Sequence, residues 1–132
     1  MRCAAVLLCL AAFAGCGVEA PDLFQVTRSG ADPNANVKIV VSDSGTVRCN
    51  GAEHALTAKL LLRARELARN LGKQAELGLE LPPGAGSTLR YSARLESGHV
   101  AFSDRSNGQP KTFFQLAQIT KDVAEDVCGI NR

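Results

Sequence analysis

The sequence has no tryptophan, a single methionine, two histidines and only 5% aromatic residues among its 132 residues. The phenylalanines and the one tyrosine are spaced like core residues, so no aromatic platform for stacking nucleobases is predicted. The formal net charge of +2 is too small to favour nucleic acid as the main partner. No uninterrupted apolar stretch reaches the length of about 18 residues that a membrane-spanning helix needs.

The motifs of common enzymes are also missing. The sequence contains no GxSxG, HExxH, phosphate-binding loop, GxGxxG or EF-hand spacing. His54 and His99 fall in expected loops and turns, and no CxxC is present, so no metal site, cofactor or catalytic residue is predicted. Asp43 and Asp104 are expected to be turn residues whose side chains bond the nearby backbone. We therefore expect a protein that is not an enzyme.

The first residues have the pattern of an export signal. Met1-Arg2 supplies one positive charge, and residues 3–14 are apolar or small throughout. As a helix this segment reaches about 18 Å, well short of a hydrocarbon core of about 30 Å. Residues 1–15 are therefore predicted to be a signal peptide rather than a membrane span.

The segment Phe13-Ala14-Gly15-Cys16 resembles the lipobox of bacterial lipoproteins. The resemblance implies that Cys16 carries diacylglycerol, that the signal is removed before it, and that residues 16–22 form a short tether. The protein would then lie on the extracytoplasmic face of the cell membrane, held by its acyl chains. The alternative is plain secretion, with an ordinary signal peptidase cutting after Ala14 or near Ala20.

Two cysteines remain once the leader is removed and Cys16 is lipidated, namely Cys49 and Cys128. An exported protein enters an oxidising compartment, where a single pairing is possible. We predict a disulfide that closes a loop of about 80 residues and stabilises the fold by about 4 kcal/mol in the chain-entropy model. The alternative is two separate buried thiols.

Hydrophobic periodicity predicts one domain over residues 23–132. Alternating apolar residues indicate strands over 23–29, 37–41, 46–50, 89–96 and 99–103, and spacings of three and four indicate helices over 58–71 and 110–128. Thr57 is the expected N-cap of the first helix, Gly72 its expected end and Pro110 the expected first residue of the second. The predicted fold is a two-layer α+β domain in the order βββαββα, with an antiparallel sheet of about five strands and two helices on one face.

Four cations fall on the polar side of the predicted strands, namely Lys38, Arg48, Arg90 and Arg94. They form either an electropositive platform for an anionic ligand or lipid headgroups, or a solvated sheet face whose long side chains cover the backbone.

The body of the chain resembles the emfourins, small protein inhibitors of thermolysin-like metalloproteases. A first strand ending in Arg28-Ser29-Gly30 is followed by a leucine-rich helix, and the similarity continues through Leu81-Pro82, Tyr91-Ser92-Ala93-Arg94-Leu95, Gly98 and a C-terminal helix with Leu116. The resemblance implies an inhibitor fold and a protein target, and no contact residue is carried over from it.

The sequence thus predicts a membrane-anchored lipoprotein with a non-enzymatic protein-binding module, in its most specific form a protease inhibitor. A loop such as 30–36 or 81–87, held by a cross-linked scaffold, would enter a partner's cleft with little loss of entropy. The alternative is an envelope lipoprotein that binds a small or anionic ligand through the basic sheet face.

Replacement Cys16→Ser removes the thiol that lipidation needs. We expect the variant to leave the membrane fraction and to lose a globomycin-sensitive shift in gel mobility that the parent chain shows. Undiminished membrane association of the variant would contradict the lipoprotein assignment.

Overall fold

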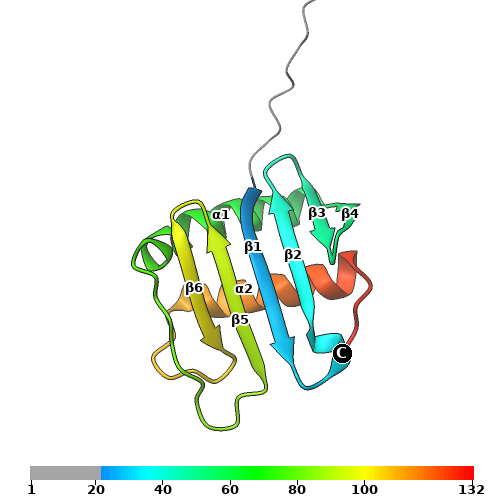
Figure 1. Cartoon of the computed structure of the whole chain (residues 1–132). Coiled ribbons are helices and arrows are strands. Elements are labelled where there is room, and N and C mark those ends of the chain that lie inside the picture. Colours follow the sequence, from blue (N-terminus) through cyan, green and yellow to red (C-terminus); the bar gives the residue numbers. More distant parts are fainter. Residues whose placement is uncertain (1–21) are drawn as a thin grey trace, which may run out of the picture.

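An open antiparallel sheet lies against two helices in the computed structural model of the chain, which describes residues 22–132 (Figure 1). The predicted signal peptide and Cys16 lie outside the described residues. The strands are β1 Asp22–Gly30, β2 Val37–Ser42, β3 Thr46–Cys49, β4 Ala52–Ala55, β5 Leu89–Leu95 and β6 Gly98–Ser103. The helices are α1 Ala58–Glu76 and α2 Lys111–Asp122, with a short 3₁₀ turn η1 Pro33–Ala35 and a π turn η2 Val123–Val127.

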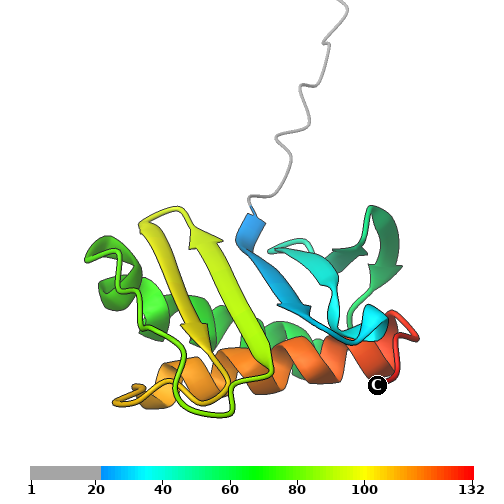
Figure 2. The ribbon, with the colours of Figure 1, turned by 60° about the horizontal axis from the view of Figure 1, so that its bottom comes forward.

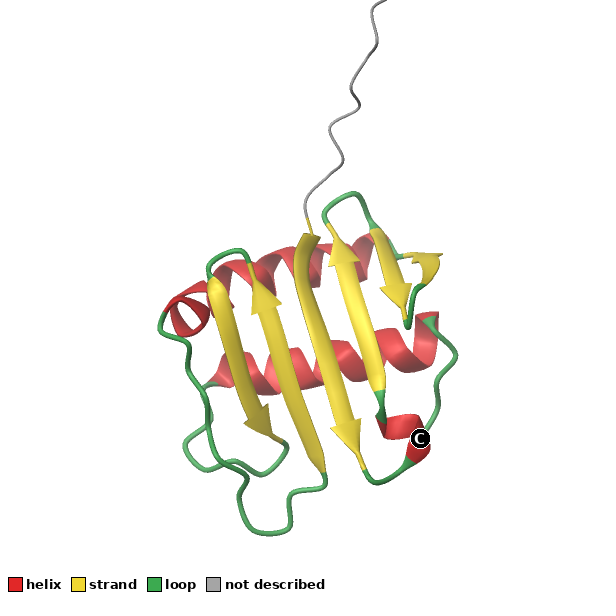
Figure 3. Ribbon diagram, in the orientation of Figure 1, coloured by secondary structure: helices red, strands yellow, loops and turns green. Residues whose placement is uncertain are grey.

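Strand β1 lies inside the sheet, whose strand order is β4-β3-β2-β1-β5-β6. Val26 pairs with Ile39 of β2 on one side and with Ala93 of β5 on the other. Because side chains alternate along a strand, these positions face the helices while the neighbouring positions face away from them. Both helices cover the same face of the sheet, as Figures 2 and 3 show. The predicted two-layer α+β fold is therefore confirmed.

The core fills the space between the sheet and the helices. Helix α1 contributes one buried stripe, Leu60, Ala64, Leu67, Leu71 and Ala75. At the centre, the Phe102 ring stacks on Tyr91 with ring centroids 5.0 Å apart and on Phe113 at 4.4 Å. These contacts join β5, β6 and α2 through one aromatic column.

The sheet has six strands rather than about five, and the element order begins with four strands. Strand β4 was not predicted, and the predicted third strand wrongly included Asn50. Asn50 and Gly51 adopt positive φ values of 49° and 91°, the geometry of a two-residue type I′ hairpin, and Asn-Gly is the usual sequence for it. The Asn50-Gly51 dipeptide therefore indicated in the sequence a hairpin turn followed by the additional strand, β4.

The helix ends also differ from their predicted positions. Thr57 is the N-cap as predicted, accepting a hydrogen bond from the Leu60 amide at 3.2 Å. The predicted end at Gly72 is wrong, because α1 continues for another turn to bury Ala75. At this point the backbone of Gly98 lies so close to the Ala75 carbonyl that a β-carbon would clash with it. Pro110 is the N-cap of α2 rather than its first helical residue.

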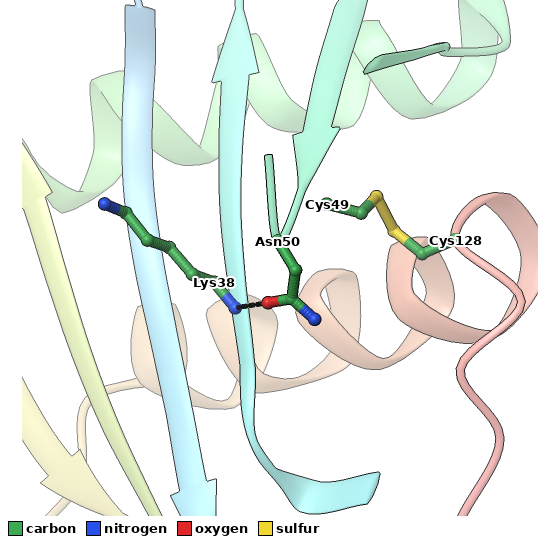
Figure 4. Close-up of a disulfide and its surroundings, with 4 residues drawn as sticks. All are labelled: Lys38, Cys49, Asn50 and Cys128. Carbon is green, nitrogen blue, oxygen red and sulfur yellow. Dashed lines mark hydrogen bonds between the residues drawn. A yellow bond between two sulfur atoms is a disulfide. The ribbon is translucent and has the colours of Figure 1, made fainter. Parts of the chain in front are cut away.

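Cys49 and Cys128 lie at disulfide distance in the structure, with their α-carbons 5.9 Å apart (Figure 4). Cys49 is the last residue of β3, and Cys128 follows the π turn η2. The fold therefore brings the predicted pair together and connects the β3 side of the sheet to the chain after α2. Asn50, next to Cys49, accepts a hydrogen bond from the Lys38 amide at 2.8 Å and fixes the same corner.

The domain begins one residue earlier than predicted, because Asp22 belongs to β1 rather than to the tether. Within residues 22–132, no helix has the length and apolar character needed to cross a bilayer.

Replacement Phe102→Ala should remove the middle ring of the aromatic column. Because Phe102 is 0% exposed, we expect the free energy of unfolding to fall by about 3–5 kcal/mol. The matched control is Phe114→Ala on α2, where the side chain is 57% exposed and the loss should stay below about 1 kcal/mol. Equal losses in urea unfolding would contradict this core assignment.

Candidate functional site

Two loops that are distant in the sequence meet at one end of the sheet. Gly30, the last residue of β1, pairs with Leu89, the first residue of β5. The loop after β1, residues 31–36, and the loop before β5, residues 82–88, therefore lie at the same end, the lower end in Figure 1. We call these two segments the loop edge. A shallow hollow lies here, lined by residues of β1, β5, β6 and the second loop, among them Gly30, Pro83 and Thr88.

The first loop is held by side chains on both of its sides. Asp32 accepts a hydrogen bond from the Asn34 amide at 2.9 Å, and Asn36 accepts one from the Gly30 amide at 3.2 Å. From β1, the Arg28 guanidinium donates to the Ala35 carbonyl at 2.8 Å and to the Asn34 carbonyl at 3.1 Å. Four hydrogen bonds thus fix the six residues of this loop.

The second loop is held mainly by Asp104, which follows β6. Its carboxylate accepts hydrogen bonds from the Thr88 amide at 3.0 Å, the Thr88 hydroxyl at 2.8 Å and the Leu89 amide at 3.2 Å. Asp104 bonds backbone amides, but the prediction that this backbone is nearby in the sequence is wrong, because Thr88 and Leu89 are fifteen residues or more away.

The start of the second loop has its own hydrogen bonds. The Ser106 hydroxyl donates to the Pro82 carbonyl at 2.7 Å, and the Arg90 guanidinium donates to the Leu81 carbonyl at 2.6 Å. Gly84 packs so tightly against the Arg105 carbonyl that a larger residue would not fit. The loop is therefore shaped before any partner binds.

The hydrogen bonds to Asp104 also determine its ionisation. Partial desolvation raises the pKa of Asp104, but the bonds from Thr88 and Leu89 together outweigh this effect and lower the pKa below the ordinary value of 3.8. A carboxylate whose pKa is lower in the folded state stabilises the fold above its unfolded pKa and loses this effect as the pH falls through the folded pKa.

The four predicted cations lie on the sheet face that the helices leave open. Arg48, Val40, Gln25 and Arg94 occupy one row across β3, β2, β1 and β5, and Lys38 lies in the next row. Arg48 pairs with Asp22 at 3.5 Å, and Arg90 holds the second loop through the Leu81 carbonyl. Lys38 and Arg94 are exposed. Half of the predicted basic platform is therefore engaged in contacts within the fold.

The titratable side chains form no compact cluster at the loop edge. Asp43 pairs with Arg65 at 2.6 Å at the other end of the sheet, and His99 lies 3.2 Å from Glu80. Across residues 22–132, no group of three His, Cys, Asp or Glu side chains is arranged to hold a metal ion. The loop edge therefore consists of two backbone segments that hydrogen bonds hold in place. Such a surface is suited to recognising a partner by its shape.

Arg28, which lies in β1 and holds the first loop, was not among the predicted site residues. Arg28 is only 2% exposed. It continues the alternation of Phe24 and Val26 along the strand, and this pattern indicated that its side chain faces the core. Ser106 and Gln109, which also bind backbone carbonyls here, had no comparable signal.

The chain matches no family model, no curated protein and no solved structure in comparisons with known proteins.

Replacement Asp104→Ala should remove the three hydrogen bonds that hold Thr88 and Leu89. At pH 7 we expect a loss of about 1–2 kcal/mol in the free energy of unfolding. The difference from the parent chain should shrink as the pH falls from about 4 through the lowered pKa of Asp104, because the carboxylate first becomes protonated in the unfolded chain and then in the folded one. A matched control is Glu53→Ala, an exposed carboxylate on β4. A difference that does not change between pH 7 and pH 3 would contradict the role of the Asp104 charge.

Proposed function

We propose that the protein is a membrane-anchored extracytoplasmic lipoprotein whose domain is a non-enzymatic protein-binding module, with the loop edge as its contact surface. The observation that carries this proposal is the convergence of two hydrogen-bonded loops at the end of the sheet opposite to the start of β1. Each loop exposes a short run of residues, 31–34 in the first and 82–83 with 85–86 in the second.

The position of the anchor supports this orientation. A lipid on Cys16 would be joined to the domain at Asp22, where β1 begins. Residues 17–22 reach at most about 20 Å, which keeps this end of the sheet near the bilayer. Strand β1 then runs for nine residues to Gly30, a rise of roughly 26 Å at about 3.3 Å per residue. The loop edge would thus be directed away from the membrane.

The fixed shape of the loops supports binding to a folded partner. Ordering a flexible loop at an interface costs about 0.5–1.5 kcal/mol for each immobilised side chain. Hydrogen bonds of Arg28, Asp104 and Ser106 already order the loops in the folded domain. Much of this loss of entropy therefore occurs during folding and not on binding. The predicted Cys49–Cys128 disulfide would add rigidity to the scaffold.

The most specific form of the proposal is inhibition of a thermolysin-like metalloprotease. The resemblance to the emfourins supports it, and a pair of short, fixed loops suits insertion into an enzyme's cleft. Inhibition would require no catalytic group from this chain.

A direct test is inhibition of thermolysin by the purified protein, with variants at two surfaces. Ala85→Arg places a long charged side chain on the exposed part of the second loop, and we expect it to weaken inhibition by about tenfold or more. Arg94→Glu changes the open sheet face instead and should leave inhibition unchanged. Absence of inhibition at micromolar protein, or equal sensitivity to both replacements, would contradict the inhibitor proposal.

A second candidate is binding of an anionic ligand or lipid headgroups by the open sheet face, favoured by the exposed Lys38 and Arg94. The same Arg94→Glu variant distinguishes it. It should weaken binding to vesicles with anionic headgroups, whereas Ala85→Arg should not.

A further inference from the structure

A second hollow lies on the helical side of the sheet. It shares Leu89 with the hollow at the loop edge, and Arg28, which holds the first loop, also lines it. It has a volume of about 530 Å³ and lies beside α2, where β1, β5 and the end of the chain approach the helix. Its apolar wall includes Leu89, Phe114 and Ala117, and its polar wall includes Arg28, Tyr91 and Arg132. The walls therefore offer an apolar surface and donor groups to the same ligand.

Arg28 brings a buried positive charge to this hollow. None of the ion pairs formed within residues 22–132 includes Arg28, and its hydrogen bonds go to the neutral carbonyls of Asn34 and Ala35. Removing a guanidinium from water without an anionic partner is costly. Burial accordingly lowers the pKa of Arg28, and Arg132 lowers it further, whereas Tyr91 and Glu125 oppose the shift.

Tyr91 supplies a hydroxyl on the same wall. Burial raises the pKa of Tyr91 above 10.0, although Arg28 opposes the shift. The phenol therefore keeps its proton at neutral pH and is able to donate a hydrogen bond to an anion.

The charges that line the hollow have an excess of positive sign. The side chains of Arg28, Lys121 and Arg132 are positive, and that of Glu125 is negative. One carboxylate could pair with the planar guanidinium groups in the bidentate way that such groups allow. Inorganic phosphate would also be attracted by these cations, but it would leave the apolar wall uncovered.

We propose that this hollow binds a small molecule that carries one carboxylate on an apolar body. The carboxylate lies between Arg28, Arg132 and the Tyr91 hydroxyl, and the apolar body covers Leu89 and Phe114. Occupation of the site requires neither protease inhibition nor lipidation, although Arg28 also holds the first loop of the loop edge.

Calorimetric titration of the full chain in lipid nanodiscs tests the proposal with benzoate, its neutral analogue benzamide, and inorganic phosphate. Benzoate should bind about tenfold more tightly than benzamide, because only benzoate brings a negative charge to pair with the guanidinium groups. Phosphate should bind more weakly than benzoate. Equal affinities for benzoate and benzamide, or tighter binding of phosphate, would overturn the proposal.

Variants locate the site. Tyr91→Phe removes only the hydroxyl, and Arg132→Gln removes an exposed charge; each should weaken benzoate binding about fivefold or more. Arg69→Gln on α1, which removes an exposed charge away from the hollow, is the matched control and should bind as the parent chain does. If Tyr91→Phe does not fold, Arg132→Gln decides the test. Unchanged affinity in Arg132→Gln, or an equal loss with Arg69→Gln, would place the binding elsewhere.

Discussion

The antiparallel pairing of β1 with both β2 and β5 is the constraint on which the rest of the structure depends. It joins two segments of chain that are about sixty residues apart and places Gly30 directly against Leu89. The same register directs Phe24, Val26 and Arg28 toward the helices and leaves the intervening polar residues on the open face. A slip of one residue would exchange the two faces, exposing the core and separating the loop edge from its supports.

Burial of one sheet face by α1 and α2 forms the core and leaves the opposite sheet face mainly polar, while Leu62, Leu77 and Phe114 remain exposed elsewhere. The aromatic column around Phe102 joins the sheet to α2, while the predicted disulfide connects β3 to the chain beyond that helix. Hydrogen bonds from Arg28 and Asp104 then extend the rigid part of the domain into its loops. The loops depend on side chains from neighbouring elements, so their shape is a property of the tertiary fold.

Local sequence patterns predicted the parts of the fold that are determined locally. Alternation identified β5, and Thr57 was recognised as a helix cap. The missed strand β4 had a local signal in Asn50-Gly51, which was overlooked. The convergence of the two loops could not be predicted in the same way, because strand order depends on packing between distant segments. Asp104 was identified as a residue that bonds backbone, but only the structure shows that it fixes the loop before β5.

The central claim is that the loop edge is fixed before any partner binds, and native-state hydrogen exchange measured by NMR tests it most directly. The amides of Ala35 and Leu89, each hydrogen-bonded at the loop edge, should exchange far more slowly than free peptide amides, and Val26 in β1 should be protected to the level of global unfolding. Exchange of Ala35 and Leu89 at the rate of an unstructured peptide, in a protein whose Val26 amide is protected, would contradict the claim.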